Sequence, residues 1–146
     1  MFTTLATAYS ITFINRDEKQ RTICWFPAAG FPAILGTVVP GHSSKHVSMP
    51  GAWNGSWRTI FDGGNPSESS IRGEVTFNGF VGDTYYDVEA IDNCCDNSGV
   101  KWLYPASGNG VHSGCNTFPC DGAYKKWDDI QTQSTSEKDL VCEIGG

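Results

Sequence analysis

Apolar and polar residues alternate in several short stretches of the chain, as they do in β-strands that bury one face. The first stretch, 9–15, places Tyr9, Ile11 and Phe13 on one face and polar residues on the other. The segments that we expect to form strands are 9–15, 22–26, 43–49, 55–61, 71–77, 84–91, 100–104 and 140–144. Turn-forming residues recur between them at spacings of roughly ten. The pattern predicts an all-β sandwich or barrel.

The connections between these segments differ in composition. The mixed-charge run 16–21 is predicted to be a hairpin connection between the first two strands. The segment 27–41 is rich in proline and glycine, and we expect it to be a loop that contains one short apolar strand. Residues 123–130 can form about two helical turns, which are too short to be stable without packing.

Six cysteines, 17 glycines and only 18% charged residues are typical of a disulfide-stabilised protein from an oxidising compartment. We therefore expect secretion and a disulfide framework built from Cys24, Cys94, Cys95, Cys115, Cys120 and Cys142. Their spacing alone does not fix the pairing. The adjacent Cys94 and Cys95 are expected to bond different partners, because neighbouring residues rarely meet disulfide geometry. A zinc site is disfavoured because no C-x-x-C pair is present.

The net charge of -6 argues against a nucleic-acid partner, which needs clustered Lys and Arg, whereas the ten here are scattered. Apolar runs are broken well before the ~20 residues of a membrane-spanning helix. Near the start, Ala6-Thr7-Ala8 has the small-x-small form of a signal cleavage site, so residues 1–8 are interpreted as an N-terminal extension or signal remnant. Residues 9–146 are expected to form a single monomeric domain without a cofactor or metal.

The segment 72–96 concentrates acidic residues, and no basic residue follows Arg72 before Lys101. If the strands 71–77 and 84–91 pair, alternation turns one face of the pair toward the core. The other face then presents a polar set made of Glu74, Tyr85, Asp87 and Glu89. Asp92 has the opposite parity and joins this set only from the following loop or through a bulge.

Clustered carboxylates repel one another, which raises the pKa of at least one of them unless a cation or solvent compensates. Two such groups can hydrolyse a glycosidic bond as acid and base or nucleophile. Without catalysis they can accept hydrogen bonds from sugar hydroxyls while Tyr85 or a tryptophan stacks on a sugar ring. They can also bind Ca²⁺, although no EF-hand spacing is present. The remaining interpretation is a solvated polar strand face, and the residues alone leave these alternatives open.

Two further residues are candidates for surface roles. Trp53 lies beside a predicted turn and is therefore the best sugar platform among the five tryptophans. The sequence Asn54-Gly55-Ser56 is an N-glycosylation sequon, which predicts a surface position for Asn54 in a secreted chain. No G-x-S-x-G elbow supports a hydrolase triad.

Several segments, taken in order, resemble the thaumatin-like protein family. ITFIN followed by CWF is similar to its opening strand pair, and GAWNGSWRTIF is similar to its glycine and tryptophan segment. GEVTFNGFVGDTYYDVEAID resembles its acidic strand pair, and CDGAYKKWDDIQTQSTSEKDLVCEIG resembles its closing segment. The resemblance implies a flattened, disulfide-stabilised β-sandwich. Only residues 95–119 correspond to the family's second domain, so a reduced, loop-rich second region is expected.

In that family one Arg, one Glu and three Asp line an acidic cleft. The resemblance assigns the Glu and two Asp positions to Glu74, Asp87 and Asp92, whose spacings match. It offers Arg72 for the Arg, closer to the Glu than in the family, and Asp96 for the last Asp. It also implies a disulfide bond that ties the first strand pair to the last strand, between Cys24 and Cys142.

By resemblance, the chain is a secreted carbohydrate-binding protein that recognises β-1,3-glucan or a related cell-wall glycan. The ligand would contact Glu74, Asp87 and Asp92, with Arg72, Tyr85, Glu89, Asp96 and Trp53 as further candidates. One alternative is an endo-β-1,3-glucanase in which Glu74 is the acid and one of the two Asp residues is its partner. Another alternative is a secreted defence or effector-like protein whose acidic face binds a protein or a membrane component.

Overall fold

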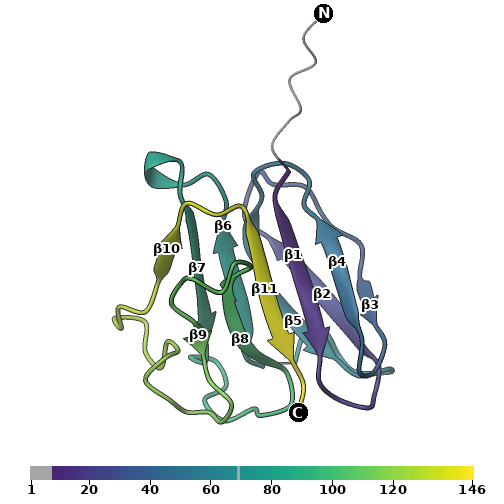
Figure 1. The fold of residues 1–146 in the computed structure, drawn as a ribbon. Helices are drawn as coiled ribbons and strands as arrows, with labels where there is room; N and C mark the ends of the chain where they lie inside the picture. The colour runs from purple at the N-terminus through teal and green to yellow at the C-terminus, as the bar shows by residue number, and fades with distance from the viewer. Residues whose placement is uncertain (1–7, 69) are drawn as a thin grey trace, which may run out of the picture.

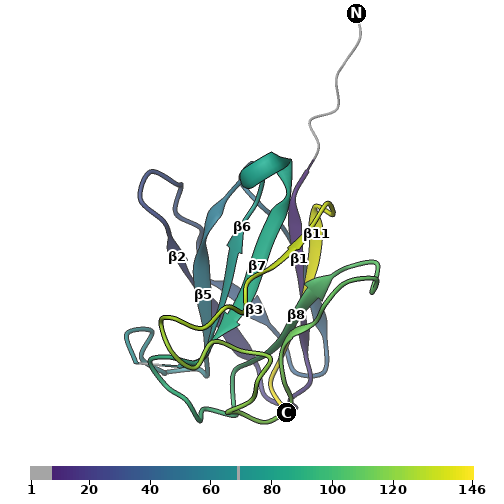
Figure 2. The same ribbon diagram turned by 90° about the vertical axis from the view of Figure 1, so that its left-hand side faces the viewer.

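The structure is a computed structural model that describes residues 8–68 and 70–146. The expected N-terminal extension, residues 1–8, lies outside the described residues except for Ala8. The described chain forms two β-sheets that pack face to face (Figures 1 and 2). The predicted all-β sandwich is therefore confirmed. Within the described residues no helix has the length and apolar character needed to cross a membrane.

The two sheets draw their strands from both ends of the chain. The five-stranded sheet has the order β4 (Ser44–Ser48), β1 (Ser10–Asn15), β11 (Asp139–Ile144), β8 (Val100–Pro105) and β9 (Ser113–Gly114). The six-stranded sheet has the order β10 (Gln133–Thr135), β7 (Thr84–Glu89), β6 (Arg72–Thr76), β5 (Asn54–Ile60), β2 (Arg21–Pro27) and β3 (Thr37–Val39). β1 and β11 are parallel, and the other pairs are antiparallel.

Every segment predicted to be a strand overlaps one in the structure, and the short strand predicted within residues 27–41 is β3. A short 3-10 turn, η1 (Phe80–Gly82), joins β6 to β7. Alternation does not reveal β9 and β10, because they are only two and three residues long.

The prediction of a hairpin between the first two strands is wrong, because β1 and β2 lie in different sheets. The side chain of Asn15, at the end of β1, donates hydrogen bonds to the carbonyls of Lys19 at 2.9 Å and Val39 at 3.1 Å. Val39 belongs to β3 of the other sheet. Asn15 thus fixes the point at which the chain passes from one sheet to the other.

The predicted helical turns in residues 123–130 are also absent. The carboxylate of Asp129 accepts hydrogen bonds from the backbone N–H groups of Lys125 and Lys126, at 2.7 and 3.0 Å. These bonds close a local turn instead of a helix. Just before it, the backbone N–H of Tyr124 donates to the carbonyl of Val88 in β7 at 3.0 Å. The segment is therefore anchored beside β7.

The core between the sheets is built around aromatic rings. Trp25 contacts Trp53 and Trp57 with ring centroids 5.6 and 5.7 Å apart. Trp53 is completely buried, and its indole N–H donates to the carbonyl of Pro32 at 2.8 Å. Its predicted role as a surface sugar platform is therefore wrong. A Cβ on Gly73 would lie 2.3 Å from the ring of Trp57, so glycine is required where β6 crosses this ring.

The structure contains disulfide bonds between Cys94 and Cys95 and between Cys115 and Cys120, whereas Cys24 and Cys142 are free. The expectation that the adjacent cysteines bond different partners is wrong, and so is the expected bond between Cys24 and Cys142. Alternation along β2 explains the second error. Because both neighbours of Cys24 point into the core, its thiol faces away from it, while Cys142 lies in the core.

Candidate functional site

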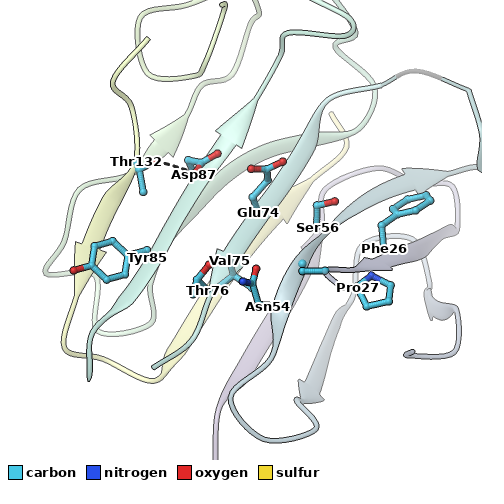
Figure 3. Close-up of a pocket in the computed structure, with 12 residues that line it drawn as sticks. Phe26, Pro27, Asn54, Ser56, Glu74, Val75, Thr76, Tyr85, Asp87 and Thr132 are labelled. Atoms are coloured by element: carbon cyan, nitrogen blue, oxygen red, sulfur yellow. Dashed lines mark hydrogen bonds between the residues drawn. The ribbon is translucent and has the colours of Figure 1, made fainter. Parts of the chain in front are cut away.

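Polar side chains cover the outer face of the six-stranded sheet where β6 and β7 pair. The cross-strand pairs on this face are Arg72 with Glu89, Glu74 with Asp87, and Thr76 with Tyr85. The intervening residues, including Val75 and Val88, are buried in the core. The predicted polar face of Glu74, Tyr85, Asp87 and Glu89 is therefore confirmed. Figure 3 shows Glu74, Tyr85 and Asp87 on it.

Arg72 neutralises two of the carboxylates. Its guanidinium lies 2.5 Å from the Glu89 carboxylate and 2.9 Å from that of Asp92, which Arg58 also approaches at 3.4 Å. The other oxygen of Glu89 accepts a hydrogen bond from the backbone N–H of Ile91 at 2.5 Å. Glu89 and Asp92 thus form an ion-paired network that also holds the loop after β7.

Glu74 and Asp87 have no such partner. Among the described residues neither forms an ion pair, and their carboxyl groups face each other across β6 and β7 (Figure 3). Asp87 is only 7% exposed, and its Oδ2 accepts a hydrogen bond from the Thr132 hydroxyl at 3.3 Å. Its Oδ1 is buried without a hydrogen-bond partner among the described residues. Asp87 therefore carries a buried, unsatisfied oxygen, and half-buried Glu74 lies next to it.

Burial, reinforced by the neighbouring charge of Glu74, raises the pKa of Asp87 to about 7. Burial also raises the pKa of Glu74, because the opposing attraction of Arg72 is weaker. The pair therefore retains a proton close to neutral pH. At that pH one member can donate a hydrogen bond while the other accepts.

Two hollows meet at this pair, and together we call them the acidic groove. The first has a volume of about 500 Å³, and its polar and aromatic lining comprises Phe26, Asn54, Ser56, Glu74, Thr76, Tyr85, Asp87 and Thr132. The second has a volume of about 380 Å³ and is lined by Arg72, Glu74, Asp87, Glu89, Ile91, Asp92, Tyr124, Trp127 and Thr132. Glu74, Asp87 and Thr132 line both, so the two hollows adjoin at these residues. Figure 3 shows the first one crossing from β2 to β7.

Of the predicted site residues, Arg72, Glu74, Tyr85, Asp87, Glu89 and Asp92 all line the groove. Alternation favours Glu89 and the family resemblance favours Asp92, and the structure brings both to Arg72. Asp96 does not join them. Its carboxylate accepts hydrogen bonds from the backbone N–H and the hydroxyl of Ser98 at 2.9 and 2.7 Å, and it lines a separate hollow beside Arg21.

Sequence reasoning missed several groove residues. Thr132, Tyr124 and Trp127 come from the irregular segment before β10, which has no periodic pattern to indicate its position. Phe26 could have been found, because it alternates with the core residue Trp25 and must face outward.

Asn54 is half-buried at the start of β5, not in a turn, and it lines the first hollow. Its glycosylation stays a prediction. A glycan attached there would occupy the first hollow.

Among the described residues, no group of three His, Cys, Asp or Glu side chains is arranged to hold a metal ion.

Comparison with known proteins finds similarity to a curated protein in sequence and to several solved structures in fold. No family model matches the chain. Antigenic protein SchS21 of Stachybotrys chartarum is 39% identical over 140 residues, which cover 93% of this chain and 94% of that protein.

The crystal structure of the protein elicitor MoHrip2 from Magnaporthe oryzae superposes with a TM-score of 0.70 at 12% identity, over 95% of this chain and 100% of the elicitor. The thaumatin-like xylanase inhibitor TLXI gives a TM-score of 0.60 at 15% identity, over 92% of this chain and 97% of the inhibitor. The chain therefore belongs to the same family as antigenic protein SchS21, and its fold is the thaumatin-like fold that the sequence resemblance implied.

Proposed function

We propose that the protein is a secreted, defence-type carbohydrate-binding protein that holds a cell-wall glycan, β-1,3-glucan or a related polymer, in the acidic groove. The observation that carries this proposal is that Glu74 and Asp87 lie where the two hollows meet. Neither carboxyl group forms an ion pair within the described residues. A buried carboxyl, Asp87, and a half-buried one, Glu74, that lack ion-pair partners are costly unless a ligand satisfies them. Sugar hydroxyls can do so because each both donates and accepts hydrogen bonds.

The lining of the first hollow suits a sugar chain. Ionised Glu74 can accept hydrogen bonds from hydroxyls, and protonated Asp87 can donate one. Asn54 and Ser56 add amide and hydroxyl groups on β5. Tyr85, whose hydroxyl donates to the carbonyl of Phe80 at 3.1 Å, offers a fixed ring for an apolar sugar face. Hydrogen bonding and stacking together are the chemistry of carbohydrate recognition.

The similar proteins support the defence-type role. They are described as an antigenic protein, a protein elicitor and a xylanase inhibitor. The two disulfide bonds support secretion, because such bonds persist in oxidising compartments. The description of the xylanase inhibitor also favours, as the main competing function, binding of a carbohydrate-active protein by the same acidic face.

Catalysis is a second candidate, favoured by the raised pKa of Asp87. A glycosidase needs one protonated carboxyl and one ionised carboxyl on either side of the bond. In this groove Asp87 is the better acid and Glu74 the better ionised partner, which reverses the roles that the resemblance suggests. Asp92 is a poor partner because Arg72 and Arg58 hold its carboxylate.

The binding proposal is tested by retention of the purified protein on insoluble β-1,3-glucan. Glu74→Gln combined with Asp87→Asn should abolish retention without lowering the melting temperature. A matched control, Glu18→Gln with Asp62→Asn, removes two exposed carboxylates outside the groove and should bind like wild type. Undiminished retention of the groove variant would contradict the proposal. Release of reducing ends from a soluble β-1,3-glucan tests catalysis, and no release by the wild-type protein removes that alternative.

A further inference from the structure

The second hollow contains more negative charge than its own residues neutralise. Its lining has four carboxyl groups, from Glu74, Asp87, Glu89 and Asp92, and one guanidinium, from Arg72. Arg58 reaches Asp92 from outside the lining and brings the number of cations to two. Glu74 and Asp87, which retain one proton between them close to neutral pH, have no counter-charge for the negative charge that is left. The composition therefore fits a ligand that brings a positive charge of its own.

Asp87 gives an independent indication of a missing partner. The side chain is more than nine-tenths buried, it lines the hollow, and its Oδ1 has no hydrogen-bond partner among the described residues. A buried oxygen left without a partner loses the hydrogen bonds that it would make with water. A donor placed between Asp87 and Glu74 would satisfy it, and an ammonium group supplies three donors and a charge.

Aromatic side chains form the rim next to these carboxyls. Trp127 lines the second hollow and is 86% exposed, so its ring is free to contact a ligand. Tyr124 is fixed beside it, because its hydroxyl shares a hydrogen bond of 2.7 Å with Thr132 and its backbone is bonded to β7. Aromatic faces attract cations and stack on flat apolar surfaces. A ligand that combines a ring with a positive charge satisfies both parts of the hollow.

We propose that the second hollow binds a protonated amino sugar, with its ammonium group between Glu74 and Asp87 and its ring against Trp127. The glycan that the groove prefers is then a polymer with free amino groups, not a neutral or N-acetylated one. This inference rests on the proposed function, since it specifies the glycan held in the same groove. A hydroxyl can satisfy a carboxylate but cannot offset its charge, and an acetamido group is neutral as well. A lysine side chain has the ammonium group but no ring to cover Trp127.

The test compares retention on particles of chitosan, which carries free amines, with retention on chitin, which has the same backbone with acetylated nitrogens. Wild-type protein should bind chitosan at least about tenfold more tightly, because a charge-assisted hydrogen bond contributes that much to binding. Glu74→Gln with Asp87→Asn should abolish the preference. Trp127→Ala should weaken binding to chitosan and, because the side chain is exposed, leave the melting temperature unchanged.

Adsorption driven only by the net charge of -6 is excluded by the matched control. Glu18→Gln with Asp62→Asn removes at least as much negative charge as the groove variant and should keep the full preference for chitosan. An equal loss in both double variants would overturn the inference. Equal binding of wild type to chitin and chitosan would also overturn it while leaving the proposed function standing, and binding to none of the glycans would overturn both. Oligolysine and a glucosamine oligomer of equal charge are then compared as competitors for binding to chitosan. If oligolysine competes as strongly, the inference is overturned and the hollow is assigned to a protein partner.

Discussion

Replacing Glu74 by Gln isolates the electrostatic coupling at the centre of the groove. The substitution removes one negative charge and keeps the size of the side chain. Burial and the charge of Glu74 together raise the pKa of Asp87 to about 7. In Glu74→Gln, burial and the weaker influence of Glu89 still raise this pKa, while the Thr132 hydrogen bond and Arg72 lower it. The pKa of Asp87 should therefore fall, yet stay above the ordinary value of an aspartate.

The pairing register gives the size of this fall. Glu74 and Asp87 are directly opposite in an antiparallel pair, where Cβ atoms lie about 4.5–5.5 Å apart. Two unit charges about 6 Å apart interact by about 3 kcal/mol at an effective dielectric constant of ~20. This energy corresponds to about two pKa units, and solvent near the half-buried Glu74 reduces it. We expect the pKa of Asp87 to drop by about one to two units.

The assay is an NMR titration of the side-chain carboxyl carbons in wild type and Glu74→Gln. Glu18→Gln is the control, because its exposed carboxylate lies outside the groove and should leave the pKa of Asp87 unchanged. A pKa of Asp87 that stays near 7 in Glu74→Gln would refute the coupling. A fall to the ordinary aspartate value would refute burial as the larger cause.

The same shift makes stability depend on pH. Because folding raises the pKa of Asp87 from 3.8 to about 7, the folded state binds this proton more tightly than the unfolded state. The resulting stabilisation is fully present below pH 3.8 and is lost as the pH rises through about 7. A shift of about three units corresponds to about 4 kcal/mol. In Glu74→Gln the loss of unfolding free energy between pH 4 and pH 8, measured with urea, should be smaller by about 2 kcal/mol than in Glu18→Gln.

Two further predictions concern the ion-paired network and the cysteines. Arg72→Met should lower the free energy of unfolding by about 3 kcal/mol, since it leaves the buried Glu89 unpaired, and urea unfolding that matches wild type would contradict this role. Thiol titration of the unreduced, denatured protein should find the two thiols of Cys24 and Cys142, of which only the half-exposed Cys24 reacts in the native state. If no thiol is found, Cys24 and Cys142 form a disulfide bond and the prediction is wrong.

Local alternation predicted the strands and the polar face because a strand's side chains alternate whatever it packs against. The predicted strand segments each overlap a strand, and Glu74, Tyr85, Asp87 and Glu89 share one face. The same rule, applied to β2, already places Cys24 outside the core. The Cys24–Cys142 bond that the resemblance implies is absent, because Cys24 faces away from the core and Cys142 lies in it.

Which carboxylates remain available to a ligand was decided only by the tertiary structure. The sequence shows an acidic stretch with one arginine at its start, and it does not say which acids that arginine neutralises. Cross-strand register brings Arg72 to Glu89, and the loop after β7 brings Asp92 to the same guanidinium.

The sequence by itself determined the sandwich, its polar face and the thaumatin-like resemblance, because these follow from short-range alternation and ordered motifs. The tertiary structure decided that Trp53 is core, that Asp96 lies apart, and that Thr132 and Trp127 complete the groove. Such contacts join segments far apart in the chain, and their geometry depends on how the two sheets and their loops pack. No local pattern encodes that packing.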